Sequence, residues 1–317
     1  MKATYFTEAG DGRGLGHLKR YEAFADLLPE LEIEPILYRS DFQKLNGFRS
    51  WTNKATQQNR ALFDSSDLVI VDSYVADSDF FASTNCLEKV IYIDDFLILD
   101  YPRGLFIDWT VGAEIYREPV GEATAFGLDY CPVRAAFKDQ LRTSNKLELI
   151  NIVTVFGGDD PTDLTPQVYR ALSGRYNVTC VATSSYPCFN DFKHNPHFKF
   201  DLTDDDYVQR LLSADLVISA GGQSLYELTS LGVPTMAIST ADNQTQDVSG
   251  FRDRGMIFEW SPTDVPLKDL ANLIGSITSD EIAVVTRNMR NGVRDGSMLR
   301  SAVLDYLNCK PLGALGQ

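Results

Sequence analysis

A glycine-rich segment near the start of the chain carries a histidine that could act as a base. Residues Gly10–Gly16 contain four glycines directly after a short apolar run, and His17 follows at the first turn of an expected helix. Closely spaced glycines let backbone N–H groups approach a ligand, and a helix N-terminus favours the neutral imidazole, which can accept a proton. We therefore predict that His17 is catalytic and that Gly14 and Gly16 contact the substrate. The alternative is a histidine that only packs on the turn.

Polar residues also follow two later apolar runs. Tyr74 comes just after the run that ends at Asp72, where its hydroxyl could orient a substrate or donate a proton. We predict a catalytic role for Tyr74; an aromatic residue that closes the core is the alternative. Asp94 and Asp95 end the next run, and these paired carboxylates could bind sugar hydroxyls or cap the following turn. Both interpretations of Asp94 stay open.

The second half of the chain repeats the pattern of an apolar run followed by glycines. Phe156 is followed by two glycines that can present N–H groups to a pyrophosphate, and the run ending at Ala220 is followed by two more. A helix with Ser224 near its first turn then favours bound anions through its N–H groups and dipole. Glu227 lies one turn further and could accept hydrogen bonds from a ribose diol. The predicted nucleotide-binding residues are Gly157, Gly158, Gly221, Gly222, Ser224 and Glu227.

Two amides after the next apolar run complete the set. Asn243 and Gln244 can hydrogen-bond a neutral polar ligand, so we predict that they bind the substrate.

Alternating β-branched runs and helical patterns position these residues. The alternation predicts βαβ units with parallel sheets, and the polar stretch Lys138–Lys146 separates two similar halves. We expect an α/β protein of two Rossmann-like, doubly wound domains, 1–140 and 147–317, that face each other across a cleft. Ligands of such sheets bind beyond the carboxyl ends of the strands. The expected strands are Ala3–Phe6, Ile33–Tyr38, Asp67–Asp72, Val90–Asp94, Leu105–Val111, Leu147–Phe156, Asn177–Thr183, Phe198–Leu202, Leu216–Ser219, Pro234–Ile238 and Met256–Glu259.

Composition excludes several classes of protein. The 317 residues include 29 Lys and Arg against 44 Asp and Glu, a formal charge of −15, which argues against a nucleic acid as a partner. No apolar run is long enough to span a membrane, and the first residues lack the apolar core of a signal peptide, so we expect a cytoplasmic protein. Three histidines and five scattered cysteines suggest neither a metal site nor a bound cofactor.

The segment from Ser219 to Gln244 resembles the nucleotide-diphosphate site of GT-B glycosyltransferases of the MurG type. A closer resemblance covers nearly the whole chain: the UDP-2,4-diacetamido-2,4,6-trideoxy-β-L-altropyranose hydrolases of pseudaminic acid biosynthesis, with related spore-coat polysaccharide proteins. The motifs that carry it are Gly14-Leu-Gly-His17-Leu-Lys-Arg20, Asp72-Ser-Tyr74, Ile93-Asp-Asp95, Gly127 with Tyr130, Arg134 and Phe137, Phe156-Gly-Gly158, Ala220-Gly-Gly222 with Glu227, and Ala241-Asp-Asn-Gln244.

The resemblance implies a GT-B fold and hydrolysis of a UDP-sugar with inversion at the anomeric carbon. His17 would take a proton from water, Tyr74 would position the water or the sugar, and no metal would be needed. Transfer of the sugar to an acceptor is the alternative enzymatic function, and a non-catalytic nucleotide-sugar binding protein is a third. The chain departs from the family at Thr7-Glu8, in the loop 9–13 and in the stretch after Asp95, all on the sugar side.

Overall fold

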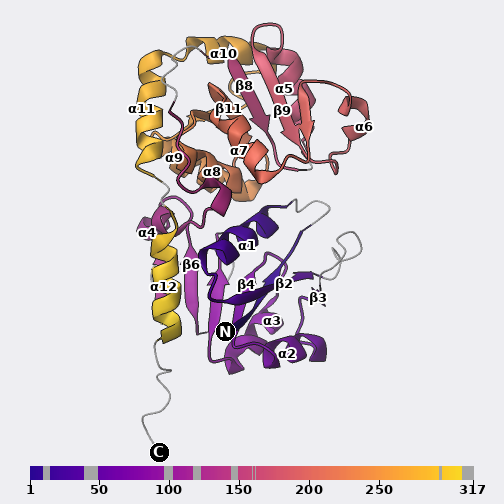
Figure 1. Cartoon of the computed structure of the whole chain (residues 1–317), viewed down its shortest axis with the longest axis vertical. Coiled ribbons are helices and arrows are strands. Elements are labelled where there is room, and N and C mark those ends of the chain that lie inside the picture. The colour runs from indigo at the N-terminus through magenta and orange to yellow at the C-terminus, as the bar shows by residue number, and fades with distance from the viewer. Residues whose placement is uncertain are drawn as a thin grey trace, which may run out of the picture. The chain divides into compact units, whose positions relative to one another are not determined.

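A computed structural model describes residues 1–9, 15–38, 49–95, 103–116, 123–143, 149–158, 160, 162–292 and 295–308. The chain divides into two compact units (Figure 1). Unit 1 is Met1–Pro132 together with the segment that starts at Gly296, and unit 2 is Val133–Asp295.

Unit 1 contains a parallel sheet of seven strands among the described residues, in the order β3-β2-β1-β4-β5-β6-β7. The strands are β1 (Lys2–Thr7), β2 (Glu32–Tyr38), β3 (Arg49–Trp51), β4 (Leu68–Asp72), β5 (Val90–Ile93), β6 (Leu105–Asp108) and β7 (Ala123–Phe126). The helices are α1 (Gly16–Leu27), α2 (Gln57–Asp64), α3 (Ser78–Ser83), α4 (Ala113–Tyr116) and α12 (Ser297–Asn308). The five strands expected in this half are confirmed, whereas β3 and β7 were not predicted.

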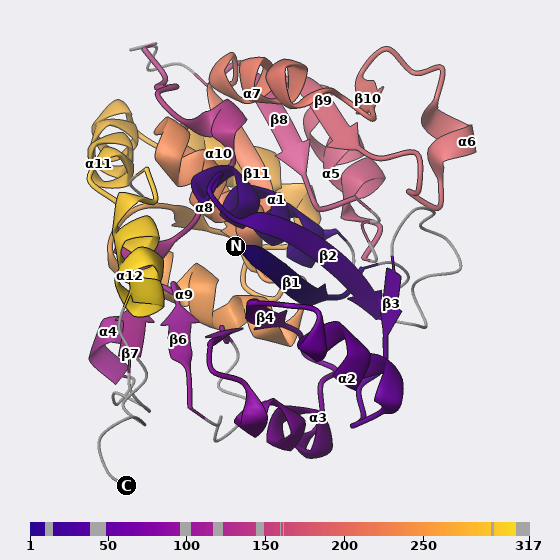
Figure 2. The same cartoon turned by 60° about the horizontal axis from the view of Figure 1, so that its bottom comes forward.

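Helices cover both faces of this sheet because successive side chains of a strand point to opposite faces. Tyr5 of β1 packs edge-on against Phe24 of α1, while its neighbour Phe6 packs against Phe63 of α2 and Phe80 of α3. Figure 2 shows α2 and α3 together on the side of the sheet away from α1. This is the doubly wound arrangement expected from the sequence.

Unit 2 contains a second parallel sheet, whose described strands follow the order β10-β9-β8-β11-β12-β13. They are β8 (Asn151–Val155), β9 (Asn177–Ala182), β10 (Phe198–Phe200), β11 (Leu216–Ala220), β12 (Thr235–Ile238) and β13 (Phe258–Glu259). The helices are α5 (Leu164–Leu172), α6 (Phe189–Phe192), α7 (Asp204–Leu212), α8 (Gln223–Leu231), α9 (Thr245–Asp253), α10 (Leu270–Ser276) and α11 (Ser279–Arg290).

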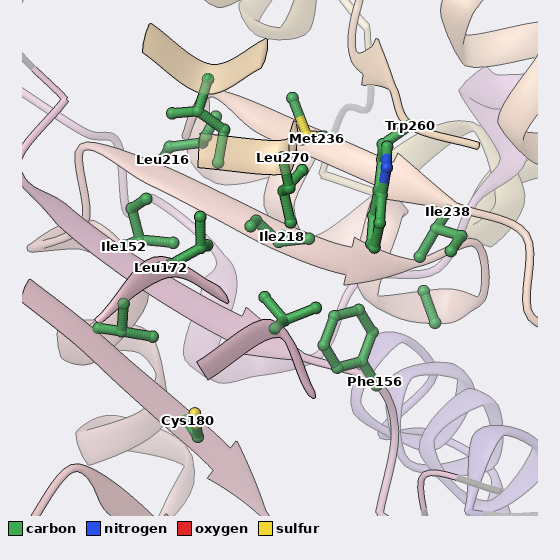
Figure 3. Close-up of a cluster of buried hydrophobic side chains, with 14 of the residues drawn as sticks. Ile152, Phe156, Leu172, Cys180, Leu216, Ile218, Met236, Ile238, Trp260 and Leu270 are labelled. Atoms are coloured by element: carbon green, nitrogen blue, oxygen red, sulfur yellow. The ribbon is translucent and has the colours of Figure 1, made fainter. Parts of the chain in front are cut away.

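One face of this second sheet forms a continuous apolar core (Figure 3). Ile152, Ile218 and Met236 come from three adjacent strands, and Leu172 of α5 and Leu270 of α10 pack on them. Burying a side chain of this size stabilises a fold by about 1.5–3 kcal/mol. The core therefore holds β8 and β11 rigidly, and the glycine turns that follow these two strands start from fixed positions.

The two ends of the expected second domain need correction. Residues 133–143 fold with unit 2, because Arg134 pairs with Glu227 and the Arg142 side chain donates to the Ala214 carbonyl at 3.2 Å. The helix α12, yellow in Figure 1, belongs to unit 1, where it packs against β7. Its Tyr306 hydroxyl accepts a hydrogen bond from the N–H of Val90 at 3.1 Å.

No helix among the residues that the structure describes is long and apolar enough to cross a membrane.

Candidate functional site

Both sheets reverse their strand order at one point, and the predicted site residues gather there. The reversal lies between β1 and β4 in unit 1, and between β8 and β11 in unit 2. Because the connections of the two neighbouring strands leave in opposite directions, a crevice opens beyond their carboxyl ends, where ligands of doubly wound sheets bind. The residues after β1 and β4, and those after β8 and β11, are therefore the first places to examine.

In unit 1, His17 lies between two buried carboxylates. Its Nδ1 atom is 4.0 Å from Oε1 of Glu8, which follows β1, and its Nε2 atom is 3.7 Å from Oδ1 of Asp72, the last residue of β4. His17 is 6% exposed, and each carboxylate residue is 1% exposed or less. Negative charges this close, in a poorly hydrated site, stabilise the imidazolium that forms when the ring takes a proton. The geometry therefore suits a general base.

Tyr74 also packs against the imidazole of His17. Its ring meets that of His17 edge-on, with 4.6 Å between the centroids. Its hydroxyl donates to Oδ1 of Asp95 at 2.7 Å and accepts from Arg20 at 3.3 Å. Burial raises the pKa of Tyr74 well above its ordinary value, so the phenol stays protonated at neutral pH. A phenol that stays protonated is a poor candidate for a base.

Arg20 lies one helical turn after His17 on α1 and contacts the acidic side chains of this cluster. Its guanidinium contacts Asp72, at 3.3 Å, and also Asp95, and it lies over the Trp109 ring at 5.5 Å. Burial opposes ionisation of Asp95, but the charge of Arg20 and the hydrogen bonds from Arg20 and Tyr74 together hold the pKa of Asp95 below its ordinary value. One guanidinium thus pairs with two carboxylates of the histidine cluster.

The structure describes two of the three other predicted positions in unit 1, Gly16 and Asp94. Gly14 lies outside the described residues. Gly16 begins α1 and is exposed, with no heavy atom within 4 Å of where a Cβ would stand, so it leaves room beside the turn. Asp94 is 1% exposed, whereas its neighbour Asp95 reaches Arg20 and Tyr74. Asp95 is therefore the member of the pair that joins the histidine cluster.

Asp72 gives the stability of the protein a distinctive pH dependence. Burial, with a smaller contribution from Asp95, raises the pKa of Asp72 from 3.8 to about 7, against the opposing charge of Arg20. The folded chain then binds a proton that the unfolded chain has released, so the free energy of unfolding falls as pH rises from about 4 to about 7, by about 1 kcal/mol per pH unit. The pKa of Asp95 is lowered instead, so Asp95 changes the free energy of unfolding only at pH values below its ordinary pKa.

We expect the Asp72→Asn variant to lose this slope. The measurement is urea unfolding between pH 4 and pH 8, followed by tryptophan fluorescence, since Trp51 and Trp109 both lie in unit 1. Asp64→Asn, at an exposed position of α2, is the matched control and should keep the wild-type slope. Parallel curves for wild type and Asp72→Asn would show that Asp72 is ionised throughout this range.

In unit 2, the predicted glycines form two turns at the reversal between β8 and β11. Gly157 follows β8 and has φ +83°, a conformation that favours glycine. The Gly158 carbonyl accepts from the Thr183 hydroxyl at 3.0 Å. After β11, Gly221 is buried, and Gly222 is the N-cap of α8, so the helix N-terminus opens directly beyond the strand. N–H groups and a positive dipole end suit an anion such as a pyrophosphate.

The side chain of Gln244 connects the Gly221 turn with the loop after β12 through hydrogen bonds. Its Oε1 atom accepts from the N–H of Gly221 at 3.1 Å and from the N–H and hydroxyl of Thr240, both at 2.9 Å. Asn243 lies beside it in a turn and is partly exposed. The oxygen of Gln244 therefore has a structural role in holding the turn, and its predicted contact with substrate stays a prediction.

Gly221 and Gly222 allow a matched test of this packing. A Cβ on Gly221 would stand 2.5 Å from Cγ2 of Val248 and 3.0 Å from Cβ of Gln244, while the nearest atom to a Cβ on Gly222 is 3.9 Å away. We expect Gly221→Ala to lower the free energy of unfolding by about 1–3 kcal/mol, because overpacking forces the turn apart. Gly222→Ala should stay within about 0.5 kcal/mol of wild type. Equal stabilities in denaturant titrations would contradict the close packing.

Glu227 is more firmly bound in the protein than expected. Its carboxylate, on α8, accepts from Nε of Arg134 at 2.6 Å and from Nη2 at 3.1 Å, and Glu227 is 4% exposed. Ser224, one turn earlier and partly exposed, lies near Tyr207 of α7, whose pKa is raised above its ordinary value by burial and by the charge of Glu227. Both predicted nucleotide-binding side chains, Glu227 and Ser224, thus have neighbours in unit 2 that lie outside α8.

Sequence reasoning gave Arg20 no role of its own, although a motif contains it, and it missed Glu8 and Trp109 as members of the histidine cluster. Arg20 lies three residues after His17, which places both on one face of α1, and Glu8 directly follows a strand, so each had a signal that could have found it. Trp109 had none, since its contact depends on how the sheet pairs. Among the described residues, no group of three or more His, Cys, Asp or Glu could hold a metal ion.

Comparison with known proteins gives distant relatives. No family model matches the chain. It is 26% identical over 271 residues to the Helicobacter pylori protein named pseudaminic acid cytidylyltransferase and UDP-2,4-diacetamido-2,4,6-trideoxy-β-L-altropyranose hydrolase, a match that covers 82% of this chain and 48% of that protein. It is 30% identical over 139 residues to the Bacillus subtilis spore coat polysaccharide biosynthesis protein SpsG, covering 41% of each chain. The chain thus spans about half the length of the Helicobacter relative that it matches.

Solved structures show the fold. Acinetobacter baumannii MurG superposes with a TM-score of 0.65 at 13% identity, covering 96% of this chain and 100% of MurG. Anabaena HepE, solved with UDP and glucose, gives a TM-score of 0.57 at 14% identity over 98% of this chain and 100% of HepE. The chain therefore has the GT-B fold, built from two Rossmann-like units, as the sequence resemblance implied.

Proposed function

We propose that this protein hydrolyses a UDP-sugar, releasing UDP and a free amino sugar for nonulosonic acid or surface polysaccharide biosynthesis. The observation that carries the proposal is the grouping of His17, Asp72 and Tyr74 beyond β1 and β4, the reversal point of the first sheet. The Helicobacter relative, whose name includes a UDP-sugar hydrolase, and the spore coat relative support the choice of substrate class.

In the proposed reaction, water attacks the anomeric carbon from the side opposite to UDP. The imidazole of His17 takes a proton from the water as the new C–O bond forms, and Glu8 and Asp72 stabilise the resulting imidazolium. The bond between the anomeric carbon and the phosphate oxygen breaks, and its electron pair leaves on UDP. The imidazolium then returns its proton to solvent. The anomeric configuration inverts because attack and departure occur on opposite faces.

Unit 2 would hold the leaving group. The N-terminus of α8, after Gly221 and Gly222, offers N–H groups and a helix dipole to the pyrophosphate, which stabilises the negative charge as the bond breaks. Gly157 and Gly158 would line the same anion, Glu227 would bind the ribose, and Asn243 would bind the sugar or a phosphate.

The test is incubation of the purified protein with a panel of UDP-sugars in the absence of any acceptor. We expect equimolar UDP and free reducing sugar, and proton NMR at early times should show the inverted anomer before it equilibrates. In ¹⁸O-labelled water the label should appear in the sugar and not in UDP, since the anomeric C–O bond is the one that breaks. Label in UDP would contradict the proposed bond cleavage.

Transfer of the sugar to an acceptor is the second candidate, because the chain has the GT-B fold of the glycosyltransferase structures that it matches. A transferase would release UDP only after an acceptor is added. Rapid UDP release without an acceptor excludes it. Tight UDP binding with no turnover on any sugar would instead indicate a binding protein.

A further inference from the structure

Arg20 shares a sequence motif with His17, but the proposed reaction gives it no role. It is 9% exposed, and its guanidinium donates to Oδ1 of Asp72 at 3.3 Å, to Asp95, and to the Tyr74 hydroxyl at 3.3 Å. These partners come from the ends of two neighbouring strands, β4 and β5. The guanidinium is therefore held in one place by contacts that are independent of each other in sequence.

Several acidic groups surround the imidazole of His17. Glu8 and Asp72 lie 4.0 and 3.7 Å from its two nitrogens, and Asp95 is close enough to interact with it electrostatically. The Tyr74 ring packs against the imidazole but stays protonated and adds no charge. Because the site is poorly hydrated, each negative charge makes the imidazole easier to protonate.

This surplus of acidic groups has a cost for a base. A histidine must be unprotonated before it can accept a proton from water, and an imidazolium in the resting protein cannot act as a base. Three acidic side chains by themselves favour the imidazolium. A cation among them has the opposite effect, because it repels the proton and stabilises the ionised carboxylates.

Arg20 is close enough to His17 for its charge to matter. Oδ1 of Asp72 lies 3.3 Å from Nη1 of Arg20 and 3.7 Å from Nε2 of His17, so the two nitrogens interact over at most about 7 Å. With an effective dielectric constant of about 20, one charge at that distance changes a titration midpoint by about 1–2 pH units. That shift is enough to decide whether a histidine is protonated at neutral pH.

We infer that Arg20 is a positioning residue that acts through His17: its positive charge keeps the imidazole unprotonated near neutral pH, so that it can serve as the base. The inference rests on the proposed function, since it assumes that His17 accepts a proton during hydrolysis. Stability alone does not require this charge, because apolar residues of similar volume often replace buried ion pairs without loss of stability.

The experiment follows the Cε1 proton of His17 by NMR between pH 5 and pH 9, in the full chain without ligand. The chain has three histidines, so comparison with His17→Asn assigns the signal. In Arg20→Met we expect the titration midpoint to rise by about 1–2 pH units. Arg20→Lys keeps the charge but loses the fork, and its midpoint should stay within about 0.5 pH unit of wild type. Lys19→Met, at an exposed position of the same helix, is the control and should leave the midpoint unchanged.

Asp95→Asn supplies the reverse test. It removes a negative charge and keeps Arg20, so the midpoint of His17 should fall by about 1 pH unit. The double variant Arg20→Met/Asp95→Asn removes one charge of each sign, and its midpoint should return to within about 0.5 pH unit of wild type. Altered packing would not produce opposite shifts that cancel. If Arg20→Met does not fold, the shift in Asp95→Asn decides the question alone.

The pH dependence of hydrolysis connects the charge with the reaction. The acidic limb of kcat/KM reports the base of the free enzyme, so in Arg20→Met it should move upward by the same amount as the NMR midpoint, with activity recovered at higher pH. Arg20→Lys should keep the limb of the wild type.

Three results would overturn the inference. A midpoint in Arg20→Met within about 0.5 pH unit of wild type, or no fall in Asp95→Asn, would mean that the carboxyl groups and not His17 respond to the charge. A raised midpoint with an unmoved acidic limb would mean that another group is the base, although UDP-sugar hydrolysis would still stand. If wild type hydrolyses no UDP-sugar, the proposed function fails, and the role of Arg20 in catalysis fails with it whatever the NMR midpoints show.

Discussion

Replacing His17 by asparagine is expected to lower kcat for UDP-sugar hydrolysis by about 10²–10⁴-fold, the usual contribution of a positioned general base. Asparagine keeps a polar group between Glu8 and Asp72 but cannot accept the proton of the attacking water. The expected residual rate comes from binding and from stabilisation of the leaving group, which the variant leaves intact. Continuous measurement of UDP release at saturating substrate gives kcat directly.

The location of the nucleotide site makes this test specific. Because the predicted nucleotide-binding residues belong to unit 2 and His17 to unit 1, UDP affinity should stay within about twofold in His17→Asn. His194→Asn makes the same chemical change at an exposed position in unit 2 and should retain wild-type kcat. A kcat for His17→Asn within about threefold of wild type would exclude His17 as the base.

The strands that carry the site could be predicted because their signal is local. β4 and β11 are buried on both faces, so each begins with consecutive apolar residues, as central parallel strands do. The edge strand β3 and the last strand β7 are short, with 3 and 4 residues, and only pairing with a neighbour makes them strands. A single sequence contains no information on that pairing at such lengths.

Contacts between segments far apart in the sequence could not be predicted either. The apolar pattern of α12 indicates a helix with a buried face, but nothing in the pattern says which unit that face will contact. From the sequence, the segment around Arg134 was assigned to the end of the first domain. In the structure, Arg134 forms an ion pair with Glu227 of unit 2, 93 residues away. The choice between Asp94 and Asp95 likewise depends on where β5 ends relative to Arg20.

The site was predictable in so far as it follows from strand ends. His17 and Tyr74 were predicted from their places after β1 and β4, and the structure brings their rings together at 4.6 Å. Their catalytic roles remain predictions. What sequence could not supply is the charge balance around them, because Glu8, Asp72 and Asp95 are distant in sequence and meet only at one edge of the folded sheet.

That charge balance predicts a second large effect, on stability. Arg20→Met keeps most of the side-chain volume but leaves Asp72 and Asp95 buried without their cation. Removing one partner of a buried ion pair lowers stability by about 3–5 kcal/mol, because the remaining charge is neither hydrated nor paired. Lys19→Met is the control on the same helix: its pair with Glu22 is exposed, and such pairs contribute about 0.3–0.5 kcal/mol.

The direction of the pH effect identifies the cause. Without Arg20 the two carboxyl groups can avoid the penalty by binding protons, so the deficit of Arg20→Met should shrink as pH falls from 8 to 5. A deficit that comes from lost packing against Trp109 would stay constant over this range. Adding Asp95→Asn to Arg20→Met should recover part of the stability at pH 8, because one stranded charge is removed. Urea unfolding of the four proteins, including Asp95→Asn alone, gives the coupling energy between Arg20 and Asp95 directly.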